Sequence, residues 1–185
     1  MQVNDVTAKT EYKPTKALSS AFEWVSAALT AVIVVALLFS AVFRLVNVEG
    51  DSMCNTLTSG DRLLISNFAY TPDYGDIVVI RRENDTPLIK RIIGLPGDTM
   101  YINPETGIVY RNGVALEEPY VLGGFTDTKG MNAEVLVEEG ALFVLGDNRS
   151  VSLDSRMLGC QSMDNLVGRV FFRLPPKTGW FTNGE

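Results

Sequence analysis

An uncharged apolar run near the N-terminus limits the fold of this chain more than any other feature. Residues Trp24 to Phe43 read WVSAALTAVIVVALLFSAVF, 20 residues without a charged side chain. As an α-helix, with a rise of about 1.5 Å per residue, this run is about 30 Å long, which matches the hydrocarbon core of a bilayer. A buried core helix of this length normally keeps a polar face, and the apolar region of a cleavable signal peptide is shorter, about 7–15 residues. We therefore predict a transmembrane helix over residues 24–43.

The charges around this run predict its orientation. Residues 1–23 carry Lys9, Lys13 and Lys16, although three acidic residues share the segment. Short segments rich in lysine and arginine tend to stay in the cytoplasm. We expect a single-pass protein of the cell membrane, with residues 1–23 in the cytoplasm and a domain at 47–185 outside the cell.

Composition limits the chemistry that this domain can perform. The 185 residues include 16 basic and 22 acidic ones, a formal net charge of −6, so we expect no nucleic-acid partner. The chain has no histidine and two cysteines, Cys54 and Cys160. A Ser-His-Asp triad, a histidine-ligated zinc site and a four-cysteine metal site are therefore excluded. The two cysteines could form a disulfide outside the cell or remain free thiols.

Beyond residue 46 the sequence predicts strands rather than helices. Short β-branched runs bounded by Gly, Pro or Asp occupy 76–82 and 88–94, and the pattern continues at 141–145 and 165–174. The turn signal Arg111-Asn112-Gly113 lies between two further short runs and predicts a hairpin. No segment in this part of the chain has a sustained 3.6-residue period. We expect a mainly antiparallel β domain.

Lys90 is a candidate general base. Strand alternation places Leu88, Lys90 and Ile92 on one face, so the lysine has apolar neighbours. A free lysine, with a pKa of about 10.4, is neutral in only about one molecule in 2,500 at pH 7. Burial that lowers the pKa by about two units raises this fraction about a hundredfold. A solvated Lys-Arg pair at a strand edge is the alternative.

Ser52 is a candidate nucleophile. It follows Gly50 and Asp51 and lies nine residues after Phe43, at most about 30 Å along the chain from the membrane boundary. Gly50 allows the backbone to bend and expose the hydroxyl, and the Ser52 amide could then donate to an oxyanion. The alternative is a polar turn leaving the membrane.

A third polar stretch lies at residues 146–156. Its 11 positions hold two acidic and two basic residues, three serines and one asparagine. This density suggests a buried hydrogen-bond network, with Asp154 and Arg156 as ion-pair partners. A solvated loop would have a similar composition.

Taken in this order, behind one N-terminal anchor, these stretches resemble the type I signal peptidases, membrane-bound serine proteases that remove signal peptides from exported proteins. The resemblance covers about residues 24–174. The matching residues are Ser52-Met53 with Thr56-Leu57, Gly75 to Val79, Lys90-Arg91 with Gly94 to Asp98, Gly146 to Arg149, Ser152, and Asp154 to Arg156.

The resemblance implies a Ser-Lys dyad. Ser52 would attack the scissile carbonyl and form an acyl-enzyme, and neutral Lys90 would act as general base. Ser152 would hydrogen-bond the Lys90 amine and orient it, and Asp154 and Arg156 would support the site as a structural pair. The implied fold is a protease domain of coiled antiparallel β-sheet on one N-terminal transmembrane helix.

The resemblance also implies the partners and the substrate. Substrates would be signal peptides of secreted preproteins with small residues one and three positions before the cut, and Met53 would line their cleft. No metal, nucleotide or other cofactor is expected. Membrane lipid is an expected partner, and the secretion machinery is a further candidate.

The sequence departs from some members of the family at two positions. Gly50 stands where they carry a serine that assists the oxyanion, as in the variants usual in Gram-positive bacteria, and Asn55 replaces a proline. Cys54 is not the expected nucleophile, because the Ser-Met pair matches at Ser52. Two rival hypotheses are a self-cleaving Ser-Lys regulator and a noncatalytic membrane-anchored β module that binds exported chains.

Overall fold

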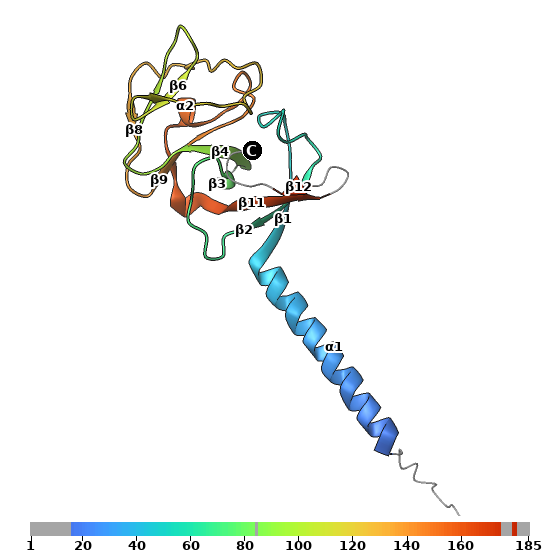
Figure 1. The fold of residues 1–185 in the computed structure, drawn as a ribbon. Coiled ribbons are helices and arrows are strands. Elements are labelled where there is room, and N and C mark those ends of the chain that lie inside the picture. Colours follow the sequence, from blue (N-terminus) through green and yellow to red (C-terminus); the bar gives the residue numbers. More distant parts are fainter. Residues whose placement is uncertain (1–15, 84, 175–178, 181–185) are drawn as a thin grey trace, which may run out of the picture. The chain divides into compact units, whose positions relative to one another are not determined.

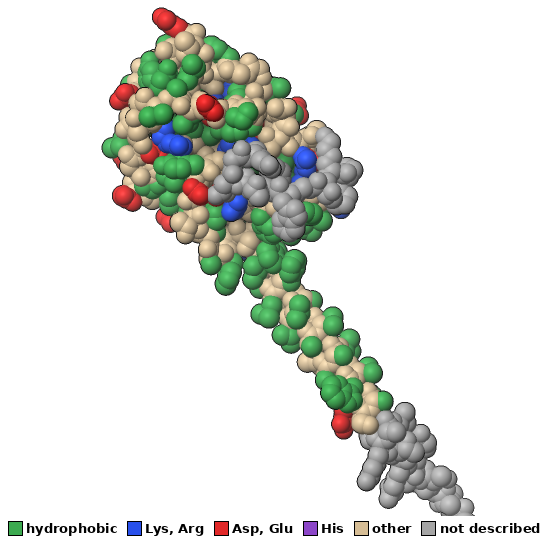
Figure 2. All heavy atoms as spheres, in the orientation of Figure 1, with side chains coloured by type: hydrophobic (Ala, Val, Ile, Leu, Met, Phe, Trp, Pro, Cys, Tyr) green, Lys and Arg blue, Asp and Glu red, His purple; other side chains and the backbone are tan. Residues whose placement is uncertain are grey.

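The computed structural model describes residues 16–83, 85–174 and 179–180, and the chain divides into two compact units at the boundary between Ala41 and Val42. The first unit is a single helix, α1 (Lys16–Val42), 27 residues long. Its segment Ser20–Val42 is long and apolar enough to cross a membrane, and its side chains are exposed, unlike those of a core helix. Figure 2 shows hydrophobic side chains along its length.

The helix differs from the predicted run of residues 24–43 at both ends. It begins eight residues earlier, because residues 16–23 contain no glycine or proline that would stop it. It ends at Val42, and Phe43 is the first residue of strand β1 (Phe43–Asn47) instead. Phe43 pairs with Ser66 across the sheet, so strand pairing, which the apolar run does not reveal, sets this boundary.

The second unit is built on an antiparallel sheet of eight strands in the order β1-β2-β11-β3-β4-β9-β10, with β12 paired to β11 (Figure 1). Its other strands are β2 (Arg62–Ser66), β3 (Ile77–Arg82), β4 (Asp85–Gly94), β9 (Ala141–Leu145), β10 (Gln161–Ser162), β11 (Leu166–Leu174) and β12 (Gly179–Trp180). The runs predicted at 76–82, 88–94, 141–145 and 165–174 correspond to β3, β4, β9 and β11.

A smaller sheet of four strands has the order β7-β6-β5-β8. These strands are β5 (Thr99–Ile102), β6 (Val109–Arg111), β7 (Val114–Ala115) and β8 (Val135–Leu136). The predicted hairpin is confirmed, because Arg111 pairs with Val114 across a two-residue turn. Asn112 and Gly113 in this turn have φ values of 53° and 76°, the left-handed conformation that such tight hairpins require.

Helical structure in the described part of the second unit is limited to two short elements, α2 (Ser155–Leu158) and the 3-10 turn η1 (Met163–Asn165). The expected mainly β, antiparallel fold is therefore confirmed. Its core anchors the segment that follows β1. Val48, Met53 and Leu57 are buried in one cluster with Ile65 and Val170. Because apolar burial fixes this segment on both sides of Ser52, the serine has a defined place in the fold.

Candidate active site

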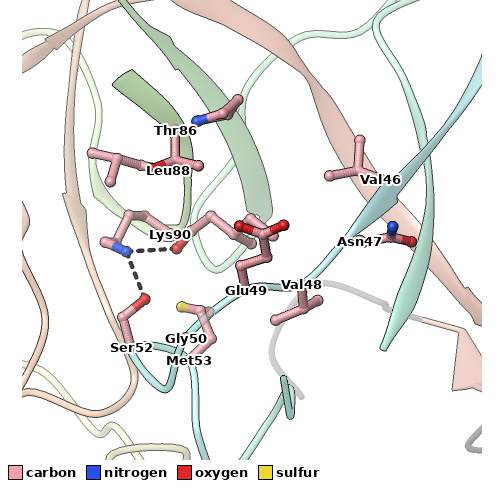
Figure 3. Close-up of a pocket in the computed structure, with 12 residues that line it drawn as sticks. Val46, Asn47, Val48, Glu49, Gly50, Ser52, Met53, Thr86, Leu88 and Lys90 are labelled. Atoms are coloured by element: carbon pink, nitrogen blue, oxygen red, sulfur yellow. Dashed lines mark hydrogen bonds between the residues drawn. The ribbon is translucent and has the colours of Figure 1, made fainter. Parts of the chain in front are cut away.

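The structure brings Ser52 and Lys90 together, although 38 positions separate them in the sequence. Lys90 lies in β4, and Ser52 lies in the turn that follows β1. The Lys90 Nζ is 2.8 Å from the Ser52 Oγ and donates a second hydrogen bond, also 2.8 Å long, to the Ile89 carbonyl (Figure 3). The hydroxyl and the amine are thus close enough to exchange a proton.

Burial gives the Lys90 amine an unusual acidity. Only 2% of the residue is exposed, and it forms no ion pair with a carboxylate in the described ranges. Desolvation lowers the pKa of Lys90 from 10.5 to about 8, while the charges of Asp154 and Asp147 partly oppose this shift. The neutral amine is therefore accessible near physiological pH.

The strand register explains why Lys90 is buried. Lys90 pairs with Val78 and Leu88 pairs with Ile80, so these four side chains share one face of the sheet. Val78 and Ile80 belong to a core cluster that also contains Ile92. The alternation predicted for this strand, with apolar neighbours around the lysine, is confirmed.

A cleft of about 220 Å³ opens beside the Ser52–Lys90 pair (Figure 3). Two extended segments form its walls, and the lining residues are Val46, Asn47, Val48, Glu49, Gly50, Ser52, Met53, Thr86, Pro87, Leu88, Ile89 and Lys90. Met53 is one of these lining residues, and its contact with a substrate stays a prediction. Gly50 has a φ of 82°, in the left-handed region that favours glycine, so the backbone bends there just before Ser52.

Asp154 and Arg156 form the predicted ion pair. The Arg156 Nη2 is 2.7 Å from the Asp154 Oδ2, and both side chains are fully buried. Burial alone would raise the pKa of Asp154, but the hydrogen bond and charge of Arg156 outweigh this effect and hold it below its usual value. The Asp154 carboxylate also accepts from the Gly146 amide at 3.2 Å, so the pair fixes the loop that carries Gly146.

That loop packs directly against the serine. The Asn148 amide donates to the Ser52 carbonyl at 3.0 Å. A Cβ atom on Gly146 would lie 2.5 Å from the Ser52 carbonyl oxygen and 2.2 Å from the Ser152 Oγ. Only glycine leaves room for this approach, so Gly146 sets the distance between the loop and the serine.

Ser152 is fully buried near this point, but its hydroxyl forms no hydrogen bond to Lys90 in the structure. The two acceptors of the Lys90 amine are the Ser52 hydroxyl and the Ile89 carbonyl. The Ser152 carbonyl accepts a bond of 2.7 Å from Lys129. An orienting contact from Ser152 to Lys90 therefore stays a prediction.

Two further buried ion pairs were not predicted. Arg91 binds Asp147 with two hydrogen bonds of 2.9 and 2.7 Å, and Arg149 binds Glu118 at 2.7 Å. The Tyr120 ring also covers the Arg91 guanidinium at 4.0 Å. The density of charge at 146–156 could have indicated partners for Arg149. Glu118, in a loop 31 residues away in sequence, gave no local signal.

Cys54 and Cys160 are not joined to each other by a disulfide bond. The structure therefore does not contain the disulfide that was one of the two alternatives. Cys54 lies near the site, with its Sγ 3.5 Å from the Asp51 Oδ1. The described residues contain no group of three or more His, Cys, Asp or Glu side chains arranged to hold a metal ion.

A serine hydroxyl hydrogen-bonded to a buried amine beside a cleft is an arrangement that could activate a serine nucleophile without histidine. Comparison with known proteins gives the family. A family model described as "Signal peptidase, peptidase S26" matches residues 21–175. Signal peptidase I of Bacillus licheniformis is 39% identical over 158 residues, 80% of this chain and 84% of that protein. The chain therefore belongs to the signal peptidase family S26 of serine peptidases, and the predicted resemblance is confirmed.

Other relatives are similar over most of their length. Signal peptidase I P of Bacillus subtilis subsp. natto is 36% identical over 178 residues, 88% of this chain and 95% of that protein. A solved structure of a signal peptidase I from Enterococcus faecalis V583 is 32% identical and covers 54% of this chain and 97% of that chain, with a TM-score of 0.46.

Proposed function

We propose that this protein is a membrane-anchored endopeptidase that removes signal peptides from exported preproteins with a Ser52–Lys90 dyad. Its curated relatives are named signal peptidase I. The observation that carries the proposal is the 2.8 Å hydrogen bond between the Lys90 Nζ and the Ser52 Oγ, in a chain without histidine.

In the first step the Lys90 amine takes the proton of the Ser52 hydroxyl as the Oγ attacks the scissile carbonyl. With a pKa of about 8, the amine is neutral in about one molecule in ten at pH 7. The C–N bond then breaks, the Lys90 ammonium gives its proton to the leaving amine, and an acyl-enzyme remains on Ser52. A water molecule, deprotonated by Lys90, hydrolyses the ester and restores the hydroxyl.

The negative charge that develops on the substrate carbonyl oxygen during acylation and deacylation needs hydrogen-bond donors. Gly50 has no side chain that could supply one, so the backbone N–H of Ser52 is the candidate donor. The 146–156 loop supports this geometry because it holds the Ser52 carbonyl through Asn148. Asp154 and Arg156 act on the site through this loop, as positioning residues, and Ser152 would orient the Lys90 amine.

The cleft favours small side chains before the cut. Val48, Met53 and Ile89 provide buried apolar surface in its walls, and its volume of about 220 Å³ has to accommodate several substrate residues. Alanine-sized residues one and three positions before the scissile bond fit such a cleft without displacing its walls.

The apolar helix α1 fits a membrane anchor, and we propose that its N-terminus is cytoplasmic and that the catalytic unit lies outside the cell. We also propose that the catalytic unit contacts lipid through one face of its sheet. Leu45, Leu64 and Phe172 share a face opposite the buried Ile65, and 66% of Leu45 is exposed. Phe68, just after β2, is 75% exposed. Apolar side chains of this exposure are expected where a domain meets a lipid surface. Labelling of the N-terminus from outside intact cells would contradict the topology.

Cleavage of a purified preprotein in detergent tests the function. We expect the intact chain to release the signal peptide, and Ser52→Ala to reduce kcat/KM by about 10⁴-fold or more. Cys54→Ala is the matched control, since it removes a nucleophile two positions away and should retain cleavage. Equal cleavage by the intact chain and Ser52→Ala would remove the dyad. Absence of cleavage by the intact chain would favour the noncatalytic module.

A further inference from the structure

The cleft carries one exposed charge. Among its twelve lining residues, Lys90 and Glu49 are the two with ionisable side chains, and Lys90 is buried. Glu49 is exposed and forms no hydrogen bond or ion pair within the ranges that the structure describes. Figure 3 shows its carboxylate in the opening of the cleft, between the Ser52–Lys90 pair and Asn47. This carboxylate gives the cleft opening a negative charge.

The backbone direction relates Glu49 to particular substrate positions. Val48 is 4% exposed and Glu49 is exposed, so neighbouring side chains on this wall point to the floor and to the rim of the cleft. An extended substrate alternates in the same way. If the small residues one and three positions before the cut face the floor, those two and four positions before it face the rim. Glu49 lies three residues from Ser52, a distance along the backbone of at most about 10 Å. Three residues of an extended substrate cover the same distance.

We propose that Glu49 selects the charge of the substrate at the second and fourth positions before the cut, disfavouring acidic side chains and favouring basic ones. This inference rests on the proposed function and names a substrate class within it: signal peptides whose cleavage region carries no acidic residue at these rim positions. Charges that meet at a solvent-exposed rim attract or repel modestly. We expect about a tenfold preference for lysine over glutamate in kcat/KM.

Synthetic peptides with alanine at the first and third positions before the cut test this inference. One series carries Glu, Gln or Lys at the second position, another carries them at the fourth, and a third carries them two positions after the cut, away from Glu49. Each is cleaved by the intact chain, Glu49→Gln, Glu49→Lys and Glu105→Gln. Glu105 is an exposed glutamate in the turn between β5 and β6, outside the cleft, and is the matched control.

We expect the intact chain and Glu105→Gln to prefer lysine about tenfold at a rim position, Glu49→Gln to lose this preference, and Glu49→Lys to reverse it. The preference should shrink at 0.5 M salt or above, because salt screens exposed charges. Equal cleavage of the three peptides by the intact chain, or a preference that survives in Glu49→Gln, would overturn the inference. If the Glu49 variants do not fold, a salt-insensitive preference of the intact chain would also overturn it.

The uncharged glutamine peptide separates this inference from the function on which it rests. Cleavage of the glutamine peptide by the intact chain but not by Ser52→Ala would support the peptidase, whatever the charge series shows. If the intact chain cleaves none of the peptides, nor a full preprotein, the proposed function and the inference both fail.

Discussion

Lys90 and Arg91 are neighbours on β4, and both are almost completely buried, with 2% and 1% of each residue exposed. The Lys90 amine reaches a hydroxyl and a backbone carbonyl, whereas the Arg91 guanidinium binds the Asp147 carboxylate with two hydrogen bonds. Desolvation without a carboxylate partner lowers the pKa of Lys90, whereas Arg91 forms a bidentate pair with Asp147. The same strand therefore presents a buried amine without an ion pair on one face and a paired guanidinium on the other.

The contrast extends to two regions of the molecule. The cleft holds a single desolvated amine. The region beside it, which we call the arginine network, comprises the buried pairs Arg91–Asp147, Arg149–Glu118 and Arg156–Asp154. Desolvation of such pairs is costly, so they are weak evidence for net stability, but removal of one partner leaves an uncompensated charge. The comparison indicates that burial in the cleft favours a reactive amine, whereas burial in the arginine network favours a fixed geometry.

The largest expected effect separates activity from stability in the cleft. Lys90→Met keeps an unbranched side chain one atom shorter but removes the proposed base, so we expect kcat/KM on a preprotein to fall by about 10³- to 10⁴-fold. The free energy of unfolding should not fall, because the substitution also removes the cost of burying an ammonium group. Enzyme assays and urea unfolding in detergent measure the two quantities. A Lys90→Met protein that keeps its activity but loses stability would contradict the roles that we give to the two regions.

In the arginine network the larger effect should be on stability. Asp154→Ala leaves the buried Arg156 without its carboxylate and removes the acceptor of the Gly146 amide. We expect the free energy of unfolding to fall by about 3–5 kcal/mol, measured by urea unfolding. The matched control is Asp85→Ala, which breaks a solvent-exposed pair with Arg82 and should cost much less stability. Equal losses in both variants would show that burial does not distinguish these pairs.

The dependence on pH should show the same contrast with a smaller effect. The folded pKa of Lys90, about 8, lies below its ordinary value of 10.5, so the unfolded chain binds this proton more tightly. Folding is therefore penalised below pH 8, and the penalty disappears as the pH rises from about 8 to 10.5. Relative to Lys90→Met, the intact chain should gain about 3 kcal/mol of stability over that interval. Chemical unfolding at pH 7.5 and 10.5 measures this difference.

Activity provides a second reading of the same titration. If the neutral amine acts as the base that we propose, kcat/KM should rise about tenfold per pH unit below about 8 and level off above it. Stopped-time assays across this range give the profile. A rate that stays constant from pH 6 to 9 would mean that Lys90 is not the base that limits cleavage.

Much of the fold could be predicted from local patterns. The strands at 76–82 and 88–94 and the hairpin at Asn112-Gly113 follow from short β-branched runs and from a turn that requires positive φ. The exact end of α1 could not be predicted, because Phe43 is apolar enough for a membrane helix and joins the sheet only through its pairing with Ser66. Similarly, β2 is five residues long and has no distinctive boundary in sequence.

The candidate site divides in a similar way. The sequence could identify Ser52 and Lys90 by ordered motifs, and Asp154 and Arg156 by their proximity along the chain. Glu118 could not be assigned to Arg149, since a contact between a loop and a distant segment leaves no periodic pattern. The hydrogen bond from Ser152 to Lys90 that the resemblance implies is absent from the structure, and the direction of a single side chain is not encoded in a sequence motif.

By itself, the sequence determined that any catalysis must proceed without histidine, that an apolar helix precedes a mainly β domain, and which residues could act as nucleophile and base. Only the tertiary structure decided that the Lys90 amine is shielded from water, with its Nζ 2.8 Å from the Ser52 Oγ, while the neighbouring Arg91 is paired with Asp147. The physical reason is that the residue type determines which group can exchange a proton. The pKa of that group depends on tertiary packing, which removes water from around it or places charges near it.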